Sequence, residues 1–335
     1  MPTLLCFVVG TGRFFYVQIT PSQTVGDLRA KIKHENPNTI TCDENDLDLY
    51  CVVGLVRQGW YLQHNGKPID MTETSLKAYA SKTKIFATSR ISLWFNSAKT
   101  SHRGTVHVLV GLDAKARRWT ALNDALARHS LLKPFHGVEL SAPYSTVEWG
   151  VVRAVFRECT ATTTFPRVPL AHSRMDALAA GMEVVTDAHG RVDVESKEVT
   201  RVVFIDQIFS HVGRIVGVQL ESHGEVDGKR IKVHGQSDLV LRRGTQRMDI
   251  VEAKKNNMDQ GMSQCLLGCE ALADTENLDV VYGFVTNYLS WLIFKRQNSE
   301  ILTMAATIQL DGNNYPTRES LQLVAETIHG ILLMR

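Results

Sequence analysis

Residues 235–264 read GQSDLVLRRGTQRMDIVEAKKNNMDQGMSQ, and this stretch is the most informative part of the chain. Residues 237–241 and 248–253 are short apolar runs of strand length. The segment between them is polar and contains Gly244, which can adopt a positive φ at little cost. This pattern predicts a β-hairpin.

Three charged residues lie at the open end of the predicted hairpin. A three-residue loop over residues 244–246 would place Asp238 directly opposite Glu252, with Cβ atoms about 5 Å apart. Side chains alternate along a strand, so Lys254 points to the same side as Glu252. Two carboxylates this close repel each other unless a cation lies between them, and Mg²⁺ binds few carboxylates together with waters and phosphate oxygens. The pattern therefore predicts a one- or two-metal phosphodiesterase site, in which Lys254 orients a water or neutralises the phosphate.

The alternative is a surface hairpin with solvated charges, because this loose acid pattern occurs by chance in many proteins. Residues 256–273 weigh against that alternative, since they predict a helix on which Gln260 and Gln264 share one face. These two side chains could orient the site or contact a phosphate. Helix capping and solvent exposure are the other explanation for them.

Residues 196–218 predict an amphipathic helix ahead of the hairpin. Glu198 lies in its first turn, where the helix dipole favours a carboxylate, and it could equally reach the metal. Glu195 competes for either role. Three further buried strands are expected at residues 280–284, 291–294 and 301–309.

At these residues the chain resembles the PD-(D/E)xK nuclease superfamily, over residues 192–310 or thereabouts. The resemblance implies a mixed sheet flanked by helices that cuts DNA or RNA with Mg²⁺ or Mn²⁺. Ser237 stands where the superfamily has proline, which leaves the chemistry untouched. The catalytic residues that it implies are Asp238, Glu252, Lys254, Gln264 and Glu198, and the implied metal ligands are Asp238, Glu252 and Glu198.

The amino-terminal part carries an independent pattern. Residues 1–9 and 14–19 predict strands, and residues 24–34 predict a helix that ends at Asn36-Pro37. Two strands, a helix and more strands within about ninety residues predict a β-grasp, ubiquitin-like domain. The remaining expected strands are residues 47–52, 60–63 and 85–86.

Residues 23–28 (QTVGDL) and 35–37 (ENP) resemble the amino-terminal domain of Crinkler effectors, which oomycetes and some fungi deploy against host cells. The family's Leu-Phe-Leu-Ala-Lys stretch is replaced by LDLYC at 47–51, so the alternation is kept and the lysine is lost. A second landmark, HVLV, is intact at 107–110, although Asp113 stands where proline is expected. Crinklers join this type of domain to varied carboxy-terminal domains, nuclease-like ones among them.

The resemblance implies a secreted effector that is translocated into the host cell and acts in the host nucleus. As an Mg-dependent endodeoxyribonuclease it would provoke DNA damage or cell death. Host proteins are candidate partners of the amino-terminal domain. The alternative is a catalytically silent domain that binds nucleic acid or a host protein, and the intact set of Asp238, Glu252 and Lys254 favours the nuclease.

Together these patterns predict a two-domain chain of α+β or α/β class. The ubiquitin-like domain is expected at residues 1–90, and a linker that includes HVLV at 91–118, with residues 97–104 as its most polar part. The nuclease-like domain is expected at 119–335. Helices at 119–130, 147–156 and 175–182 are assigned to that domain as an extension.

Composition sets bounds on these interpretations. The chain has 335 residues, 44% hydrophobic and 21% charged, as in an ordinary soluble protein. No apolar run reaches the roughly 18 residues of a membrane span, and residues 4–10 lack the basic flank of a signal peptide. Six cysteines without metal-ligand spacing indicate a reducing compartment.

The net charge of +2 is too small to indicate nucleic-acid binding by itself. Basic clusters at 115–118, 229–232 and 242–247 could contact phosphates, with scattered surface charge as the alternative. Nucleic acid is the expected partner, DNA being favoured over RNA, and the sequence leaves the oligomeric state open. The expected nucleic-acid contacts are Lys255, Gln260, Arg242, Arg243 and Arg247.

Overall fold

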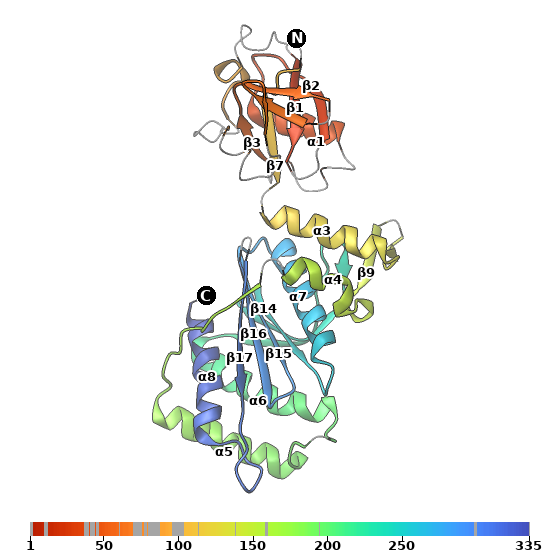
Figure 1. Ribbon diagram of the computed structural model, residues 1–335. Coiled ribbons are helices and arrows are strands. Elements are labelled where there is room, and N and C mark those ends of the chain that lie inside the picture. The colour runs from red at the N-terminus through yellow and green to blue at the C-terminus, as the bar shows by residue number, and fades with distance from the viewer. Residues whose placement is uncertain are drawn as a thin grey trace. The chain divides into compact units, whose positions relative to one another are not determined.

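The computed structural model describes residues 3–9, 13–36, 40, 44, 47–59, 61–69, 76, 79, 88–95, 104–112, 114–137, 139–157, 160–193, 195–297 and 300–334. The chain forms two compact units, Met1–Thr120 and Ala121–Arg335 (Figure 1). Both units combine helices with β-sheets, so the expected mixture of α and β structure is confirmed. Within the described residues, no helix has both the length and the apolar character needed to cross a bilayer.

A four-stranded sheet in the order β2-β1-β7-β3 forms the centre of the amino-terminal unit. Its strands are β1 (Thr3–Val8), β2 (Arg13–Gln18), β3 (Leu47–Cys51) and β7 (Val108–Leu112). Helix α1 (Val25–Glu35) begins with a capping box between Thr24 and Asp27, and it buries Val25, Leu28 and Ile32 against the sheet. The expected strands and helix of residues 1–52 are therefore present.

A smaller sheet packs on the other face of the four-stranded sheet. It contains β4 (Leu55–Gln58), β5 (Tyr61–His64) and β6 (Lys67–Pro68), in that order. Leu55 and Leu62 pack with Leu5 and Phe7 of β1. A short 3₁₀ helix, η2 (Ile91–Leu93), adds Ile91 to the core on the α1 side.

Strand β7 corrects the expected domain boundary. Residues 91–118 were expected to form a linker, but β7 lies inside the sheet of the amino-terminal unit, parallel to β1 and antiparallel to β3. Val108 and Val110 of the HVLV motif are completely buried in the core. A short apolar strand can be assigned to a sheet only through its partners, and these partners lie far away in the sequence. The expected strand at 85–86 and, apart from Gly104, the expected segment 97–104 fall outside the described residues.

The carboxy-terminal unit is built on a seven-stranded mixed sheet in the order β10-β17-β16-β15-β14-β13-β11. Neighbouring strands are antiparallel, except for the parallel pairs β14–β15 and β10–β17. Helix α7 (Met258–Thr275) connects the parallel strands β14 and β15, as such crossovers require. The strands are β10 (Thr160–Thr162), β11 (Gln219–Glu225), β13 (Gln236–Arg243), β14 (Gln246–Ala253), β15 (Val280–Thr286), β16 (Ser290–Gln297) and β17 (Glu300–Thr307).

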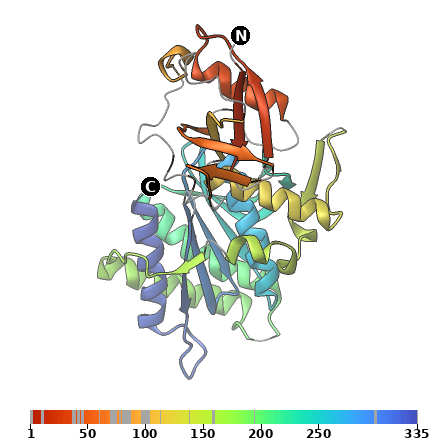
Figure 2. The ribbon, with the colours of Figure 1, turned by 45° about the horizontal axis from the view of Figure 1, so that its top comes forward.

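Helices cover both faces of this sheet (Figures 1 and 2). Phe284 of β15 packs in the large core shared with α5 (His172–His189), α6 (Glu198–Val216) and α8 (Arg318–Leu333). The adjacent Gly283 faces the opposite way, where an added Cβ would lie 2.4 Å from Cys265 Sγ of α7. Helix α7 therefore covers the second face, with α4 (Trp149–Arg157) packed against it.

Smaller elements complete this unit. Strands β8 (Lys133–Phe135), β9 (Glu139–Pro143) and β12 (Val233–His234) form a separate three-stranded sheet. A 3₁₀ helix, η4 (Tyr144–Thr146), follows β9, and α3 (Ala114–Arg128) contains the division between the two units. The expected helices and buried strands of this region are present, with somewhat different bounds. The short elements β8, β9, β10, β12 and η4 were not predicted, nor were the longer β11 and α8. Strand β11 has only one buried residue, Gly224, so it shows no apolar alternation.

The hairpin itself corrects a detail of the prediction. Its turn contains two residues, because Arg243 pairs with Gln246, and Gly244 has the positive φ of +61° that a type II′ turn needs at its first position. A β-bulge next to Leu241 then shifts the pairing by one residue. Beyond the bulge, Leu239 pairs with Val251, so Asp238 faces Glu252 as the three-residue loop was expected to arrange.

Candidate functional site

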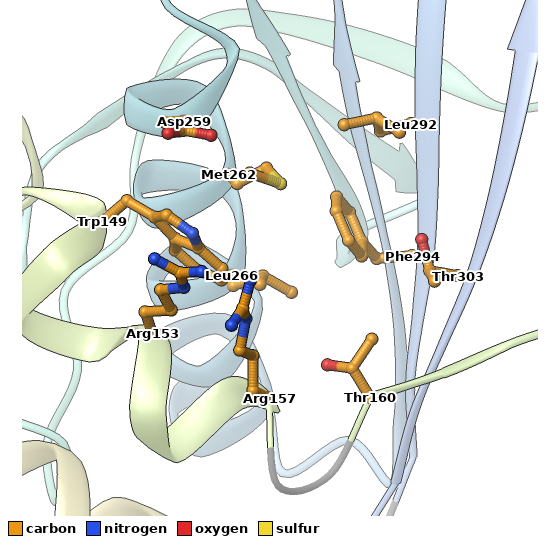
Figure 3. Close-up of a pocket in the computed structure, with 10 residues that line it drawn as sticks. All are labelled: Trp149, Arg153, Arg157, Thr160, Asp259, Met262, Leu266, Leu292, Phe294 and Thr303. Atoms are coloured by element: carbon orange, nitrogen blue, oxygen red, sulfur yellow. The ribbon is translucent and has the colours of Figure 1, made fainter.

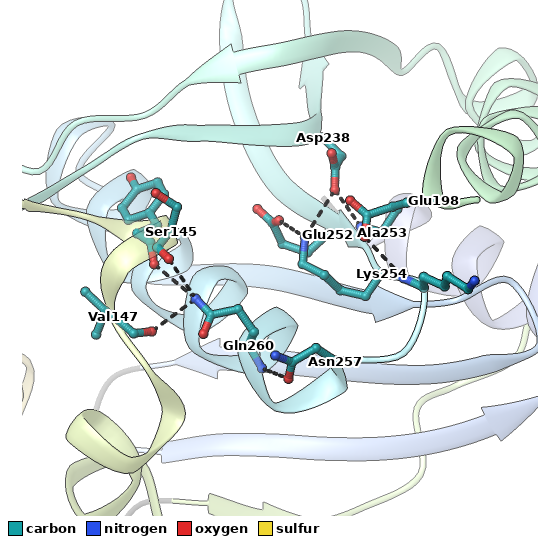
Figure 4. Close-up of polar contacts among 11 residues, drawn as sticks. Ser145, Val147, Glu198, Asp238, Glu252, Ala253, Lys254, Asn257 and Gln260 are labelled. Atoms are coloured by element: carbon teal, nitrogen blue, oxygen red, sulfur yellow. Dashed lines mark hydrogen bonds and ion pairs between the residues drawn. The ribbon is translucent and has the colours of Figure 1, made fainter. Parts of the chain in front are cut away.

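Asp238 and Glu252 lie next to each other at the open end of the hairpin (Figure 4). Leu239 pairs with Val251, so Asp238 and Glu252 follow as the next facing residues of β13 and β14. The Oδ2 atom of Asp238 accepts a hydrogen bond from the backbone N–H of Ala253 at 2.7 Å. This bond holds the Asp238 carboxylate across the strand pair and fixes its position beside Glu252.

The Lys254 ammonium lies between the two carboxylates. Its Nζ is 3.3 Å from Glu252 Oε2 and 3.7 Å from Asp238 Oδ2. The backbone N–H of Lys254 donates to Thr286 O at 2.9 Å, which extends the pairing with β15 and aims the side chain at the acids. Burial acts to lower the pKa of Lys254, but Glu252 and Asp238 outweigh it and raise that pKa, so the lysine stays a cation.

Glu252 is the most deeply buried group of the site, with only 2% of its surface exposed. Burial raises its pKa to about 7, Lys254 opposes the rise, and the charge of Asp238 adds to it. Its Oε1 atom accepts no hydrogen bond of ordinary geometry from the described residues. A buried carboxylate oxygen without a partner is costly, so this atom is suited to a further cation.

The donor set fits Mg²⁺ or Mn²⁺ better than a structural metal. Mg²⁺ keeps several waters and takes one or two carboxylates together with substrate phosphates, whereas a structural zinc needs four protein ligands. Asp238 and Glu252 supply two carboxylates, and the unpartnered Oε1 of Glu252 is available. Among the residues that the structure describes, no three His, Cys, Asp or Glu side chains come close enough to hold a metal ion together.

Glu198 lies at the edge of the site, in the first turn of α6 as expected. Its Oε2 accepts a hydrogen bond from the backbone N–H of Lys255 at 3.2 Å, so it binds the chain just after β14 (Figure 4). The Nζ of Lys255 lies 3.2 Å from Glu195 O and 3.7 Å from Glu195 Oε2. Both glutamates therefore hold Lys255, and the metal-binding role of Glu198 stays a prediction.

The two glutamines of α7 are used differently from what was expected. The Nε2 of Gln260 lies 3.3 Å from Val147 O and 3.4 Å from Tyr144 O and from Ser145 O (Figure 4). This amide therefore ties η4 to the start of α7, and its expected role as a nucleic-acid contact stays a prediction. Gln264 is partly buried, and its Oε1 has no partner among the described residues, so its catalytic role stays a prediction.

The hairpin arginines lie at the end of the hairpin away from the carboxylates. Arg242 and Arg243 lie at the turn end of β13, roughly 13 Å or more from Asp238 at about 3.4 Å per residue. Arg243 Nη2 donates to Leu332 O at 2.9 Å and to Val216 O at 3.4 Å, so it binds carbonyls at the ends of α8 and α6. The Nε of Arg247 donates to Glu276 at 2.8 Å. Arg243 and Arg247 therefore tie the far end of the hairpin to neighbouring elements. The nucleic-acid contacts expected of the three arginines stay predictions.

The sequence analysis missed one group of cavity-lining side chains, an aromatic residue and two arginines on α4. Trp149, Arg153 and Arg157 of α4 line a cavity together with residues of α7 (Figure 3). The available signal was a tryptophan followed, one turn and two turns later, by an arginine. The predicted helix at residues 147–156 gave no reason to place the face that carries Trp149, Arg153 and Arg157 next to α7.

Comparisons with known proteins concern both units. A family model described as the Crinkler effector protein N-terminal domain matches residues 3–111, which include all of β7 except Leu112. The chain is 29% identical over 358 aligned residues to Crinkler effector protein 5 of Phytophthora infestans, covering 99% of this chain and 100% of that protein. A 50-residue segment is 50% identical to Crinkler effector protein 63 of Phytophthora sojae (strain P6497), covering 15% of this chain and 11% of that protein.

Proposed function

The chain belongs to the Crinkler family of host-targeted effectors, and we propose that its carboxy-terminal unit is a nuclease of the PD-(D/E)xK type that depends on Mg²⁺ or Mn²⁺. The observation that carries this proposal is the arrangement of Asp238, Glu252 and Lys254. Two carboxylates and one ammonium group converge at the end of a hairpin, and one carboxylate oxygen is buried without a partner.

The surrounding architecture supports the same proposal. A helix precedes the hairpin, and a crossover helix links its second strand to a parallel neighbour in a mixed sheet. This is the arrangement that the resemblance to the nuclease superfamily implies. For the amino-terminal unit we propose a ubiquitin-like fold, because one helix packs on a mixed sheet whose first strand pairs with its second and with the last strand, β7.

The proposed chemistry assigns a separate task to each group. A bound divalent cation would supply Lewis acidity and a more acidic water. Asp238 and Glu252 would hold it, and Glu252 must lose its proton to do so, which links cation affinity to a pKa of about 7. Lys254 holds a positive charge beside both carboxylates, where it would stabilise negative charge that develops on phosphate oxygens.

The choice of DNA over RNA, the host nucleus as the place of action and host DNA damage or cell death as the outcome rest on the family resemblance. We propose them as the simplest use of a nuclease unit attached to the amino-terminal domain of an effector. The partners of that amino-terminal domain are then proposed to be host proteins.

A cleavage assay tests the proposed activity. Purified full-length chain is incubated with supercoiled plasmid DNA and with RNA, in EDTA and with Mg²⁺ or Mn²⁺. We expect cation-dependent cutting of DNA that is lost in Glu252→Gln and kept in Glu319→Gln, a matched change of an exposed glutamate on α8. Circular dichroism checks that both variants are folded. If the wild-type chain binds nucleic acid but no cation permits cutting, the silent binding domain is the better account.

A further inference from the structure

A cavity of about 370 Å³ lies between α4, α7 and the sheet (Figure 3). Ligand pockets in proteins have volumes of about 300–1,000 Å³, so this one has room for a single small ligand. Its inner wall is apolar, with Phe294 of β16 and Leu266 of α7. Its rim carries two arginines, Arg153 and Arg157, and one acid, Asp259.

The aromatic groups of the cavity are held in place. The ring of Trp149 stacks on Phe156, with planes 7° apart and ring centroids 6.1 Å apart. Phe156 is completely buried, so Trp149 is supported from one side by the core. Figure 3 shows the Trp149 ring and the Phe294 ring on opposite sides of the cavity. A flat aromatic ligand can therefore contact two rings without reorganising either one.

The two arginines give the cavity a positive rim. Arg153 and Arg157 lie one turn apart on α4, both side chains are exposed, and like charges in this arrangement repel each other. Within the described part of the chain, neither guanidinium group forms an ion pair or a hydrogen bond. Figure 3 shows both groups reaching toward the cavity. An anionic group at the rim would therefore bind two unpaired cations and relieve their repulsion.

A flat apolar ring joined to an anion is the chemistry of a nucleotide. We propose that this cavity binds one nucleotide, with its base between Trp149 and Phe294 and its phosphate on Arg153 and Arg157. Asp259 and Thr303 offer an acceptor and a hydroxyl group for the polar edge of the base or for the sugar. A base that is paired and stacked in a duplex cannot enter, so the ligand is an unpaired nucleotide.

This inference deepens the proposed function, because it takes the nucleotide to be part of the substrate strand. The cavity and the carboxylate site share α7, whose first turn contributes Asp259 and whose start follows Lys255 closely. A strand with an unpaired nucleotide in the cavity would thus be anchored beside the cleavage site. The same chemistry also describes a free nucleoside monophosphate, and binding measurements separate the two sources.

Binding of a fluorescently labelled single-stranded oligonucleotide to the full-length chain tests the proposal, in EDTA so that no cleavage interferes. We expect the double variant Arg153→Gln/Arg157→Gln to bind at least tenfold more weakly. The slope of log K against log salt should become less steep by about 0.7, since the two arginines share one phosphate and each phosphate contact on a single strand contributes about 0.7. Arg214→Gln, an exposed arginine on α6, is the matched control and should bind like the wild type.

Substitutions of Trp149 test the proposed stacking of the base in the cavity. Trp149→Ala should weaken oligonucleotide binding about five- to a hundredfold, as loss of base stacking does, whereas Trp149→Phe should keep most of the affinity. Unchanged affinity and salt slope in the arginine double variant would overturn the proposal. Preferential competition by a phosphotyrosine peptide would overturn it as well, because the pocket would then recognise a protein.

The outcomes also separate this inference from the proposed function. If the wild type cuts DNA and the pocket variants bind as tightly as the wild type, the pocket proposal fails and the nuclease stands. If the pocket variants lose binding and no cation permits cleavage, the nuclease proposal fails and the nucleotide pocket stands. Competition by free nucleoside monophosphate at the affinity of the oligonucleotide supports the pocket and identifies the free nucleotide as its ligand.

Discussion

At the scale of single residues, the burial of Glu252 connects the proposed chemistry with stability. The carboxylate is almost completely removed from water, and only Lys254 offers it a positive charge in the described site. Evolution toward stability alone would replace such a group by a neutral one, since buried charge is costly. A raised pKa, such as that of Glu252 beside a second carboxylate and a lysine, is instead typical of functional sites.

We predict that Glu252 lowers the stability of the cation-free protein as the pH rises. Its pKa is about 7 in the folded protein and has the ordinary value of 4.5 in the unfolded chain, so the folded protein holds a proton that the unfolded chain releases between these values. Stability is therefore fully present below about pH 4.5 and is lost toward pH 7, by up to about 3 kcal/mol.

Denaturant unfolding in EDTA at a series of pH values measures this effect as the difference between wild type and Glu252→Gln. The variant should gain stability relative to the wild type as the pH rises through this interval and should be the more stable protein above pH 7. Parallel pH profiles for the two proteins would show that Glu252 titrates normally. Mg²⁺ should stabilise the wild type more strongly above pH 7 than below it.

Lys254 provides a second prediction at this scale. Lys254→Met leaves Asp238 and Glu252 without their shared cation, and breaking a buried ion pair in this way costs about 3–5 kcal/mol. The loss should be smaller near pH 5, where Glu252 takes up a proton. Cleavage should fall at least about a hundredfold, as with loss of one charge-stabilising group. Lys133→Met, an exposed change on β8, should leave both stability and cleavage unchanged, and a Lys254→Met protein with full activity would exclude a role for the lysine.

At the scale of elements, the site depends on how closely α7 lies against β15. Gly283 makes this approach possible, because an added Cβ would lie 2.4 Å from Cys265 Sγ and 2.7 Å from Cys269 Sγ. Both cysteines are completely buried, so their sulfur atoms have little freedom to move. The position of α7 in turn sets the start of the helix beside Lys254, where a Cβ on Gly261 would lie 2.9 Å from Lys254 Cγ.

We predict that Gly283→Ala destabilises the carboxy-terminal unit by about 1–3 kcal/mol, the usual cost of overpacking a core. Cleavage should fall as well, although no catalytic group is changed, because α7 must move away from the sheet. Gly312→Ala, where nothing lies within 4 Å of the added Cβ, is the matched control. Thermal unfolding followed by circular dichroism measures the effect, and equal melting temperatures for the two variants would mean that α7 accommodates the methyl group freely.

At the scale of the whole molecule, β7 decides where the amino-terminal unit ends. It lies between β1 and β3 and buries Val108 and Val110, so a fragment that stops near residue 90 lacks the centre of its sheet. The division of the chain into Met1–Thr120 and Ala121–Arg335 places this strand with the amino-terminal unit. This unit and the proposed nuclease can therefore be separated only beyond β7.

We predict that a fragment of residues 1–120 folds alone, whereas a fragment of residues 1–90 does not. Without β7, β1 and β3 lose their shared neighbour and the core loses two completely buried valines. Dispersed amide signals in a two-dimensional NMR spectrum distinguish the two outcomes. The complementary fragment 114–335, which keeps all of α3, should cut DNA like the full chain. A folded 1–90 fragment would show that the sheet does not need β7.

Sequence alone was sufficient for the features that depend on near neighbours. Asp238, Glu252 and Lys254 belong to one hairpin, so alternation along its strands was enough to bring them to the same end, although the facing register depends on a β-bulge that the sequence did not predict. The amphipathic periods of α6 and α7 placed Glu198 and Gln264 on helices. Tertiary structure was needed for the insertion of β7, the use of Arg243 at two helix ends and the meeting of α4 with α7 around a cavity. These contacts join residues that are distant in the chain, and periodicity describes which face of an element is apolar without saying which element will cover it.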